Sequence, residues 1–118
     1  GATSVTAITG AGGRPDHALA NMLTAASDRW ADLLIDLRID SSRAWVVHDS
    51  LGLALPTGTT VSLLAVGGPA TGVTTTGLRW PLVDADLAPG LGLGMSNEVS
   101  ATSALIRVVS GTLLVIAP

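Results

Sequence analysis

The sequence predicts a mainly β protein, an antiparallel β-sandwich preceded by one strand–helix unit of an α/β domain. Three observations lead to this fold class. Up to about residue 31 the apolar residues follow first a strand period and then a helical one. Beyond that point, about six or seven short apolar runs alternate with regular turn signals, which is typical of a sandwich or barrel. The length of 118 residues suits one ordinary domain with its own core.

The strand–helix unit begins with a short strand over residues 5–9, which leads through the glycine turn 10–13 into a helix. Pro15 suits the first helical position, because its missing N–H has no intrahelical partner there. The helix is expected to continue to about Trp30. Apolar residues recur along it at steps of three and four and form one face: Leu19, Met22, Leu23, Ala26 and Trp30.

A lone strand and helix cannot form a parallel sheet. We therefore expect residues 1–31 to be the terminal piece of a larger α/β domain and residues 32–118 to be the sandwich. The strands expected in the sandwich are 33–39, 43–48, 59–66, 71–80, 99–102, 104–109 and 112–116.

Two turn sequences predict hairpins between these strands. Asp40-Ser41-Ser42 is a turn sequence between the first two runs. Ser110-Gly111 lies between the last two runs and has the form of a two-residue hairpin loop.

Composition excludes several classes of protein. Hydrophobic residues make up 47% and charged residues 13%, which excludes a disordered tail. The net charge of −3, with no lysine, leaves no basic stripe for nucleic acid. The absence of cysteine excludes disulfides, thiolate metal sites and a cysteine nucleophile. The uncharged stretch 50–78 is interrupted by glycine and proline too often to span a membrane.

The glycine turn and the residues after it form the first candidate site. Backbone N–H groups of Gly12 and Gly13 can approach a phosphate at the helix N-terminus, where the helix dipole favours an anion. Arg14 would add a bidentate phosphate contact. Asp16 would hold a divalent cation or orient an attacking hydroxyl. The alternative is a tight strand–helix turn, in which Asp16 stabilises the helix start and Arg14 is solvated.

Two other chemistries fit poorly. Gly10-x-Gly12 after a strand, with Asp36 further on, suggests a dinucleotide site, but the third glycine comes two residues too early and no second helix follows. His17 and His48 have no nucleophile or third metal ligand paired with them.

Two further segments carry candidate binding residues. Trp80, between Arg79 and Pro81, is either a packing residue or a flat platform for a ring or a cation. Ser96 and Asn97 follow a glycine-rich stretch, and an asparagine amide offers donors and an acceptor in one plane, which suits the edge of an aminopyrimidine. The alternative for Ser96 and Asn97 is a polar turn before a strand.

Taken in order, these segments resemble thiamine diphosphokinase. The resemblance extends from about residue 8 to 116 and covers roughly the C-terminal half of the family's length. It is carried by G-A-G-G-R-P-D-H-A-L-A-N at 10–21, V-S-L-L at 61–64, G-V-T-T-T-G-L-R-W-P-L at 72–82, S-N-E at 96–98 and G-T-L-L-V-I at 111–116.

The resemblance implies a cytoplasmic enzyme that transfers diphosphate from ATP to thiamine with Mg²⁺, giving thiamine diphosphate and AMP. It implies an α/β nucleotide domain followed by a β-sandwich, in a homodimer with thiamine near the subunit interface. It places Arg14 and Asp16 at the phosphate-transfer site, Trp80 on the thiamine ring, and Ser96 and Asn97 on its pyrimidine. No nucleic-acid or membrane partner is expected.

The sequence departs from the family's pattern in two ways. Pro15 stands where many relatives carry a bulky apolar residue. The acidic motifs that hold the magnesium are absent, and Asp84 and Asp86 do not replace them, since they follow Trp80 in the sandwich. We therefore expect no metal site in this chain and no diphosphokinase activity from it alone. The competing interpretation is a non-catalytic β-sandwich that serves as a binding or interaction module.

Overall fold

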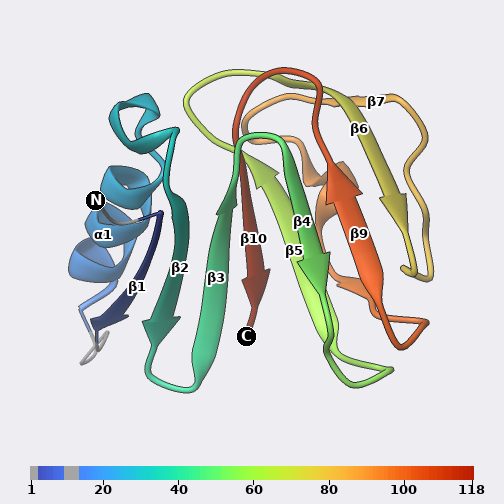
Figure 1. Ribbon diagram of the computed structural model, residues 1–118, viewed down its shortest axis with the longest axis horizontal. Coiled ribbons are helices and arrows are strands. Elements are labelled where there is room, and N and C mark those ends of the chain that lie inside the picture. The colour runs from blue at the N-terminus through green and yellow to red at the C-terminus, as the bar shows by residue number, and fades with distance from the viewer. Residues whose placement is uncertain (1–2, 10–13) are drawn as a thin grey trace.

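The computed structural model describes residues 3–9 and 14–118 (Figure 1). Its elements are β1 (Ser4–Thr9), α1 (Pro15–Ala25), η1 (Asp28–Trp30), β2 (Leu34–Ile39), β3 (Ser42–Val47), β4 (Ser50–Leu53), β5 (Thr60–Ala65), β6 (Ala70–Thr76), β7 (Ala85–Leu87), η2 (Gly92–Gly94), β8 (Asn97–Glu98), β9 (Ala104–Arg107) and β10 (Leu113–Ala117), where η denotes a 3-10 helix. None of the helices in these residues is long and apolar enough to cross a membrane.

The strands form two sheets that pack face to face. The six-stranded sheet has the order β1-β2-β3-β10-β5-β8, and the four-stranded sheet has the order β4-β9-β6-β7. All pairs are antiparallel except β1 with β2. Figure 1 shows α1 on one side of the molecule and the four-stranded sheet on the other. The predicted mainly β sandwich is confirmed.

The central strands are apolar on both faces because both faces are covered. In β10, Leu113 and Val115 belong to the core between the two sheets. Leu114, between them, belongs to a second core under α1. Side chains alternate across a strand, so a strand with covers on both sides reads as a continuous apolar run.

The strand–helix unit is continuous with the sandwich. β1 pairs in parallel with β2, from Ser4 opposite Leu34 to Thr9 opposite Ile39. β2, which is expected to belong to the sandwich, in turn pairs with β3. Segments 1–31 and 32–118 therefore contribute strands to one sheet, joined through β1 and β2.

The hairpin predicted at Asp40-Ser41-Ser42 is confirmed, since Ile39 pairs with Ser42. The hairpin predicted at Ser110-Gly111 is wrong. β9 lies in the four-stranded sheet between β4 and β6, whereas β10 lies between β3 and β5 in the other sheet. Here the chain crosses from one sheet to the other, and Ser110 forms a bridge with Thr71. The same small residues serve a crossing as well as a hairpin, so the turn sequence alone does not distinguish them.

The predicted helix extends too far, and one predicted strand is replaced by another. α1 ends at Ala25, and Ser27 then caps η1 by accepting the Arg29 N–H. A serine offers the backbone a competing hydrogen bond, and this favours a new turn over continuation of the helix. Instead of a strand over 99–102, the chain forms β8 at Asn97–Glu98 and a single bridge from Val99 to Leu78.

Candidate functional site

The loop after β6 carries the aromatic residue singled out by the sequence. Leu78 is buried and forms an isolated bridge with Val99, which anchors the loop to the core. Trp80 follows two residues later and is 53% exposed. It is therefore a surface residue on an anchored segment, rather than part of the core.

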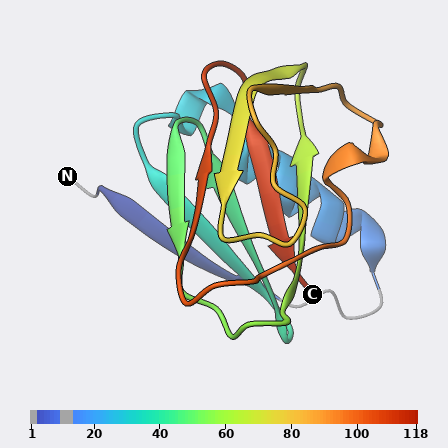
Figure 2. The same cartoon turned by 90° about the vertical axis from the view of Figure 1, so that its right-hand side faces the viewer.

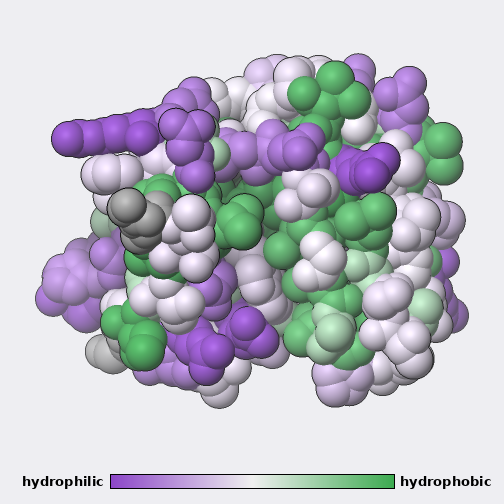
Figure 3. All heavy atoms as spheres, viewed as in Figure 1, coloured by the Kyte–Doolittle hydropathy of each residue, from purple (hydrophilic) through white to green (hydrophobic). Residues whose placement is uncertain are grey.

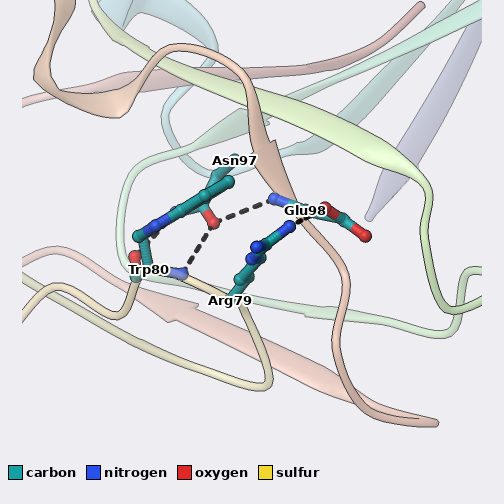
Figure 4. A network of polar contacts seen from close by, with 4 residues as sticks. All are labelled: Arg79, Trp80, Asn97 and Glu98. Carbon is teal, nitrogen blue, oxygen red and sulfur yellow. Dashed lines mark hydrogen bonds and ion pairs between the residues drawn. The ribbon is translucent and has the colours of Figure 1, made fainter.

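The side chain of Asn97 forms hydrogen bonds with both the backbone N–H and the backbone carbonyl of Trp80 (Figure 4). The Trp80 N–H donates to Asn97 Oδ1 over 3.1 Å, and Asn97 Nδ2 donates to the Trp80 carbonyl over 2.8 Å. Asn97 Oδ1 also accepts the Glu98 N–H over 2.9 Å. Asn97 is only 5% exposed. Its amide thus acts like a piece of backbone that joins β8 to the loop, and one Nδ2 hydrogen takes no part in these three hydrogen bonds.

Two charged residues beside this pair were not chosen from the sequence. The Arg79 guanidinium lies over the Trp80 ring, 4.7 Å from its centroid. Arg79 Nη1 lies 3.3 Å from Glu98 Oε2, and the Arg79 N–H donates to the Glu98 carbonyl over 2.8 Å. Each is the direct chain neighbour of a predicted site residue, Arg79 of Trp80 and Glu98 of Asn97. This adjacency is the only sequence signal for Arg79 and Glu98, and it does not indicate that two segments 19 residues apart are in contact.

Ser96 immediately precedes Asn97 in the chain. Its backbone has a positive φ of 55°, and its N–H donates to the Oγ of buried Ser62 over 3.0 Å. Its own side chain is exposed. The structure therefore brings Trp80 and Asn97 into direct contact. Ser96 precedes Asn97 in the chain, and its hydrogen bond is with Ser62.

Arg14 and Asp16 form a second site at the start of α1. Arg14 donates to Asp16 through Nε (3.1 Å) and Nη2 (2.9 Å), and both side chains are exposed. This hydrogen bonding by Arg14 lowers the pKa of Asp16 below its ordinary value of 3.8, so the carboxylate is ionised at neutral pH. The predicted phosphate-binding residues Gly12 and Gly13 lie outside the described residues.

The two groups lie far apart within one chain. Figure 1 places the start of α1 at one side of the molecule and the end of β6, which leads to Trp80, at the other. In Figure 2, which looks from the side of the four-stranded sheet, α1 lies behind both sheets. One chain alone therefore does not bring Arg14 and Asp16 to Trp80.

The hollows beside α1 do not include Trp80. One of about 550 Å³ is mainly apolar and lies between α1, β1 and β2, and another of about 340 Å³ lies between the end of α1 and the turn at 67–69. Trp80 instead presents an open surface.

No cluster of three or more histidine, cysteine, aspartate or glutamate side chains in the described part of the chain is arranged to hold a metal ion. Asp86 Oδ1 accepts the Gly72 N–H over 3.4 Å, and the Asp84 N–H donates to Thr74 Oγ1, so both residues take part in local loop contacts. The described residues do not fit a magnesium centre.

Comparison with known protein families identifies one that matches this chain. The family described as "Thiamin pyrophosphokinase, vitamin B1 binding domain" matches residues 47–113. No curated protein matches the sequence at a significant level.

Solved structures of thiamin pyrophosphokinases share the fold. The enzyme from Bacillus subtilis superposes with a TM-score of 0.84 at 20% identity, covering 98% of this chain and 55% of that one. The Geobacillus thermodenitrificans protein gives 0.80 at 24% identity, with 98% and 54% covered. The Candida albicans enzyme gives 0.75 at 12% identity, with 97% and 44% covered. The chain thus spans about half the length of these proteins.

Proposed function

Because the chain belongs to the family of the thiamin pyrophosphokinase vitamin B1 binding domain, we propose that it is the thiamine-binding portion of a thiamine diphosphokinase. The parent enzyme transfers the diphosphate of ATP to the hydroxyl of thiamine, and the products are thiamine diphosphate and AMP. Thiamine and ATP are accordingly its partners. We place the enzyme in the cytoplasm, where ATP is supplied.

The observation that carries this proposal is the exposed, backbone-clamped Trp80. Thiazolium is a permanent cation, and an aromatic face attracts a cation by about 0.5–2 kcal/mol. Because Asn97 holds both the N–H and the carbonyl of Trp80, the segment that presents the ring is ordered before a ligand arrives. A preorganised platform loses less conformational entropy on binding.

Ser96 and Asn97 are proposed to bind the aminopyrimidine of the same ligand. The exposed Ser96 hydroxyl can donate and accept, and Asn97 retains one Nδ2 hydrogen after its contacts with Trp80 and Glu98. Matched donors and acceptors matter here, because an unpaired buried polar group costs about 1–3 kcal/mol.

Arg14 and Asp16 are proposed to act in phosphate transfer in the parent enzyme, with Gly12 and Gly13 as backbone donors to phosphate. Arg14 and Asp16 lie at the N-terminus of α1, where an anion is favoured, and Arg14 supplies a guanidinium for it. The parent enzyme uses Mg²⁺, whose ligands we assign to the part of the relatives that this chain does not span. We therefore expect no AMP production by this chain with thiamine and ATP, and a burst of AMP would refute that expectation.

We further propose that the enzyme works as a homodimer. The start of α1 lies on the opposite side of the fold from the end of β6, which leads to Trp80, so the phosphate-side residues near the ring would come from outside this chain. Large apolar side chains are exposed on the segment that follows Trp80 in the chain, namely Val83, Leu91, Leu93 and Met95. Figure 3 shows apolar side chains gathered over the middle of the view, where β10, β4 and β9 lie in Figure 1.

Calorimetric titration of thiamine into the chain tests the proposed function. Trp80→Ala should weaken thiamine binding by roughly 1–2 kcal/mol, about 5- to 30-fold, because stacking is lost. Trp30→Ala is the matched control, since Trp30 is also a partly exposed tryptophan with an arginine over its ring. Thiamine binding that is absent at millimolar concentration, or equally weakened by both substitutions, would refute the assignment.

A further inference from the structure

The Trp80 platform carries a positive charge beside the surface proposed for a cation. The Arg79 guanidinium lies over one face of the Trp80 ring, 4.7 Å from its centroid. Figure 4 shows the two side chains next to each other. With that face taken, a flat ligand would stack on the opposite face. An uncompensated guanidinium at this distance would repel a thiazolium across the ring. A residue that cancels this charge therefore influences which ligands the platform accepts.

Glu98 is placed to cancel it. Its Oε2 lies 3.3 Å from Arg79 Nη1, and the Arg79 side chain is 61% exposed while that of Glu98 is 35% exposed. The backbone bond from the Arg79 N–H to the Glu98 carbonyl fixes the two residues opposite each other. The pair has no net charge.

We infer that Glu98 is a charge-selecting residue of the thiamine site. It acts through Arg79, as a positioning residue, by neutralising the guanidinium so that the Trp80 face accepts a flat cation. The inference rests on the proposed function and adds to it the property by which the site selects its ligand, namely the charge of the ring. Neither the matching family nor the contacts of Trp80 with Asn97 assign this role to Glu98.

A purely structural role explains Glu98 less well. Asn97, and not the ion pair, holds the Trp80 backbone. Ion pairs between exposed side chains contribute little to folding stability. The other arginine–tryptophan pair on an exposed segment, Arg29 over Trp30, forms no salt bridge in the described part of the chain, and stacking there persists without one.

The test compares thiamine with a neutral isostere in which carbon replaces the charged ring nitrogen. The affinity of the isostere reports how well the shape of the platform fits the ligand. The affinity of thiamine divided by that of the isostere, called the ratio below, reports the effect of the charge near the ring. Glu98→Gln leaves Arg79 uncompensated and should lower the ratio about 3- to 10-fold. Arg79→Met should raise the ratio, and the double variant should return it close to that of the unaltered chain. Raising the salt concentration should shrink the effect of Glu98→Gln.

Asp28→Asn is the matched control, since it removes one carboxylate beside the Arg29–Trp30 pair and should leave the ratio unchanged. Equal losses of both ligands in Glu98→Gln, with the ratio unchanged, would overturn this inference and leave thiamine binding intact. A lowered ratio that persists in the double variant would show that Glu98 contacts the ligand directly, and would overturn it as well. Binding of neither ligand by the unaltered chain would overturn the proposed function and this inference together.

Discussion

The buried side-chain amide of Asn97 joins the two chain segments of the site, and its removal should lower the free energy of unfolding. Asn97→Ala leaves the N–H and carbonyl of Trp80 and the N–H of Glu98 without their partner. We expect the free energy of unfolding to fall by about 2–3 kcal/mol, since unsatisfied buried groups carry the full desolvation penalty.

Urea denaturation measures this loss, and Asn21→Ala is the control. Asn21 is exposed, and among the described residues its side chain donates to the Thr9 hydroxyl alone, so its replacement should change stability by less than about 0.5 kcal/mol. If the two substitutions destabilise the protein equally, the amide of Asn97 is not the joint between the segments.

Two glycines with nearly the same φ should respond differently to alanine. Gly67 has φ of 76° and Gly77 has φ of 78°, both left-handed. A Cβ at Gly67 would meet nothing within 4 Å, whereas one at Gly77 would overlap the Ser103 carbonyl oxygen and lie 2.9 Å from Ala104 Cα. Gly67→Ala should cost about 1–2 kcal/mol for the conformation alone.

Gly77→Ala should cost a further 1–3 kcal/mol or so, because the loop that leads to Trp80 must move away from β9. Thermal and urea unfolding of the two variants give the comparison. Equal destabilisation would mean that the loop does not pack against β9 as closely as the structure has it.

At the scale of elements, α1 and the central strand β10 differ in how much of their surface is buried and in how many neighbours they pair with. α1 has no buried residue, its Leu19 and Leu23 are about half exposed, and an apolar hollow lies between it and β1. β10 is paired on both sides by β3 and β5 and has both faces covered. Local opening of α1 therefore needs less buried surface to be exposed than opening of β10.

Amide hydrogen exchange followed by NMR should show this difference. We expect amides of β10 to be among the slowest in the chain, and those of α1 to exchange at least about 100-fold faster. Protection of α1 equal to that of β10 would contradict this expectation and would indicate that α1 is covered in solution.

At the scale of the whole molecule, the proposed homodimer requires a surface that can form the interface between the two copies. Ala104 and Ile106 of β9 face the core, so Leu105 between them points outward from the four-stranded sheet. Its neighbours in register, Gly52 and Thr76, are uncharged, and the exposed Arg107 lies on the same face two residues along β9. A sheet face with an uncharged centre is suited to packing against a second copy.

Light scattering should therefore give about twice the chain mass of 11.8 kDa. Leu105→Asp should shift the protein toward the monomer, because it would place a charge in the interface. Leu34→Asp, at an exposed leucine of β2, should leave the dimer intact. A monomer at high concentration for the unaltered chain would refute the homodimer.

Local sequence signals determined a good part of this structure. Apolar period and turn residues predicted the mainly β sandwich, the strand–helix start and the hairpin between β2 and β3, because all of these depend on residues close together in the chain. The order of motifs led to the family that residues 47–113 then matched. The chemistry of their side chains predicted Trp80 and Asn97 as binding residues, but nothing in the sequence indicates that the two are in contact.

Tertiary structure alone decided which distant segments meet. It placed β9 and β10 in different sheets, although a two-residue turn sequence lies between them, because burial on two faces outweighs local turn preference. It paired β1 with β2 across the helix, and it brought Arg79 and Trp80 against Glu98 and Asn97. Local periodicity records which face of a strand is apolar, but not which strand lies beside it. The clamp on Trp80 and the charge beside it therefore follow from strand pairing, which is a property of the packed chain as a whole.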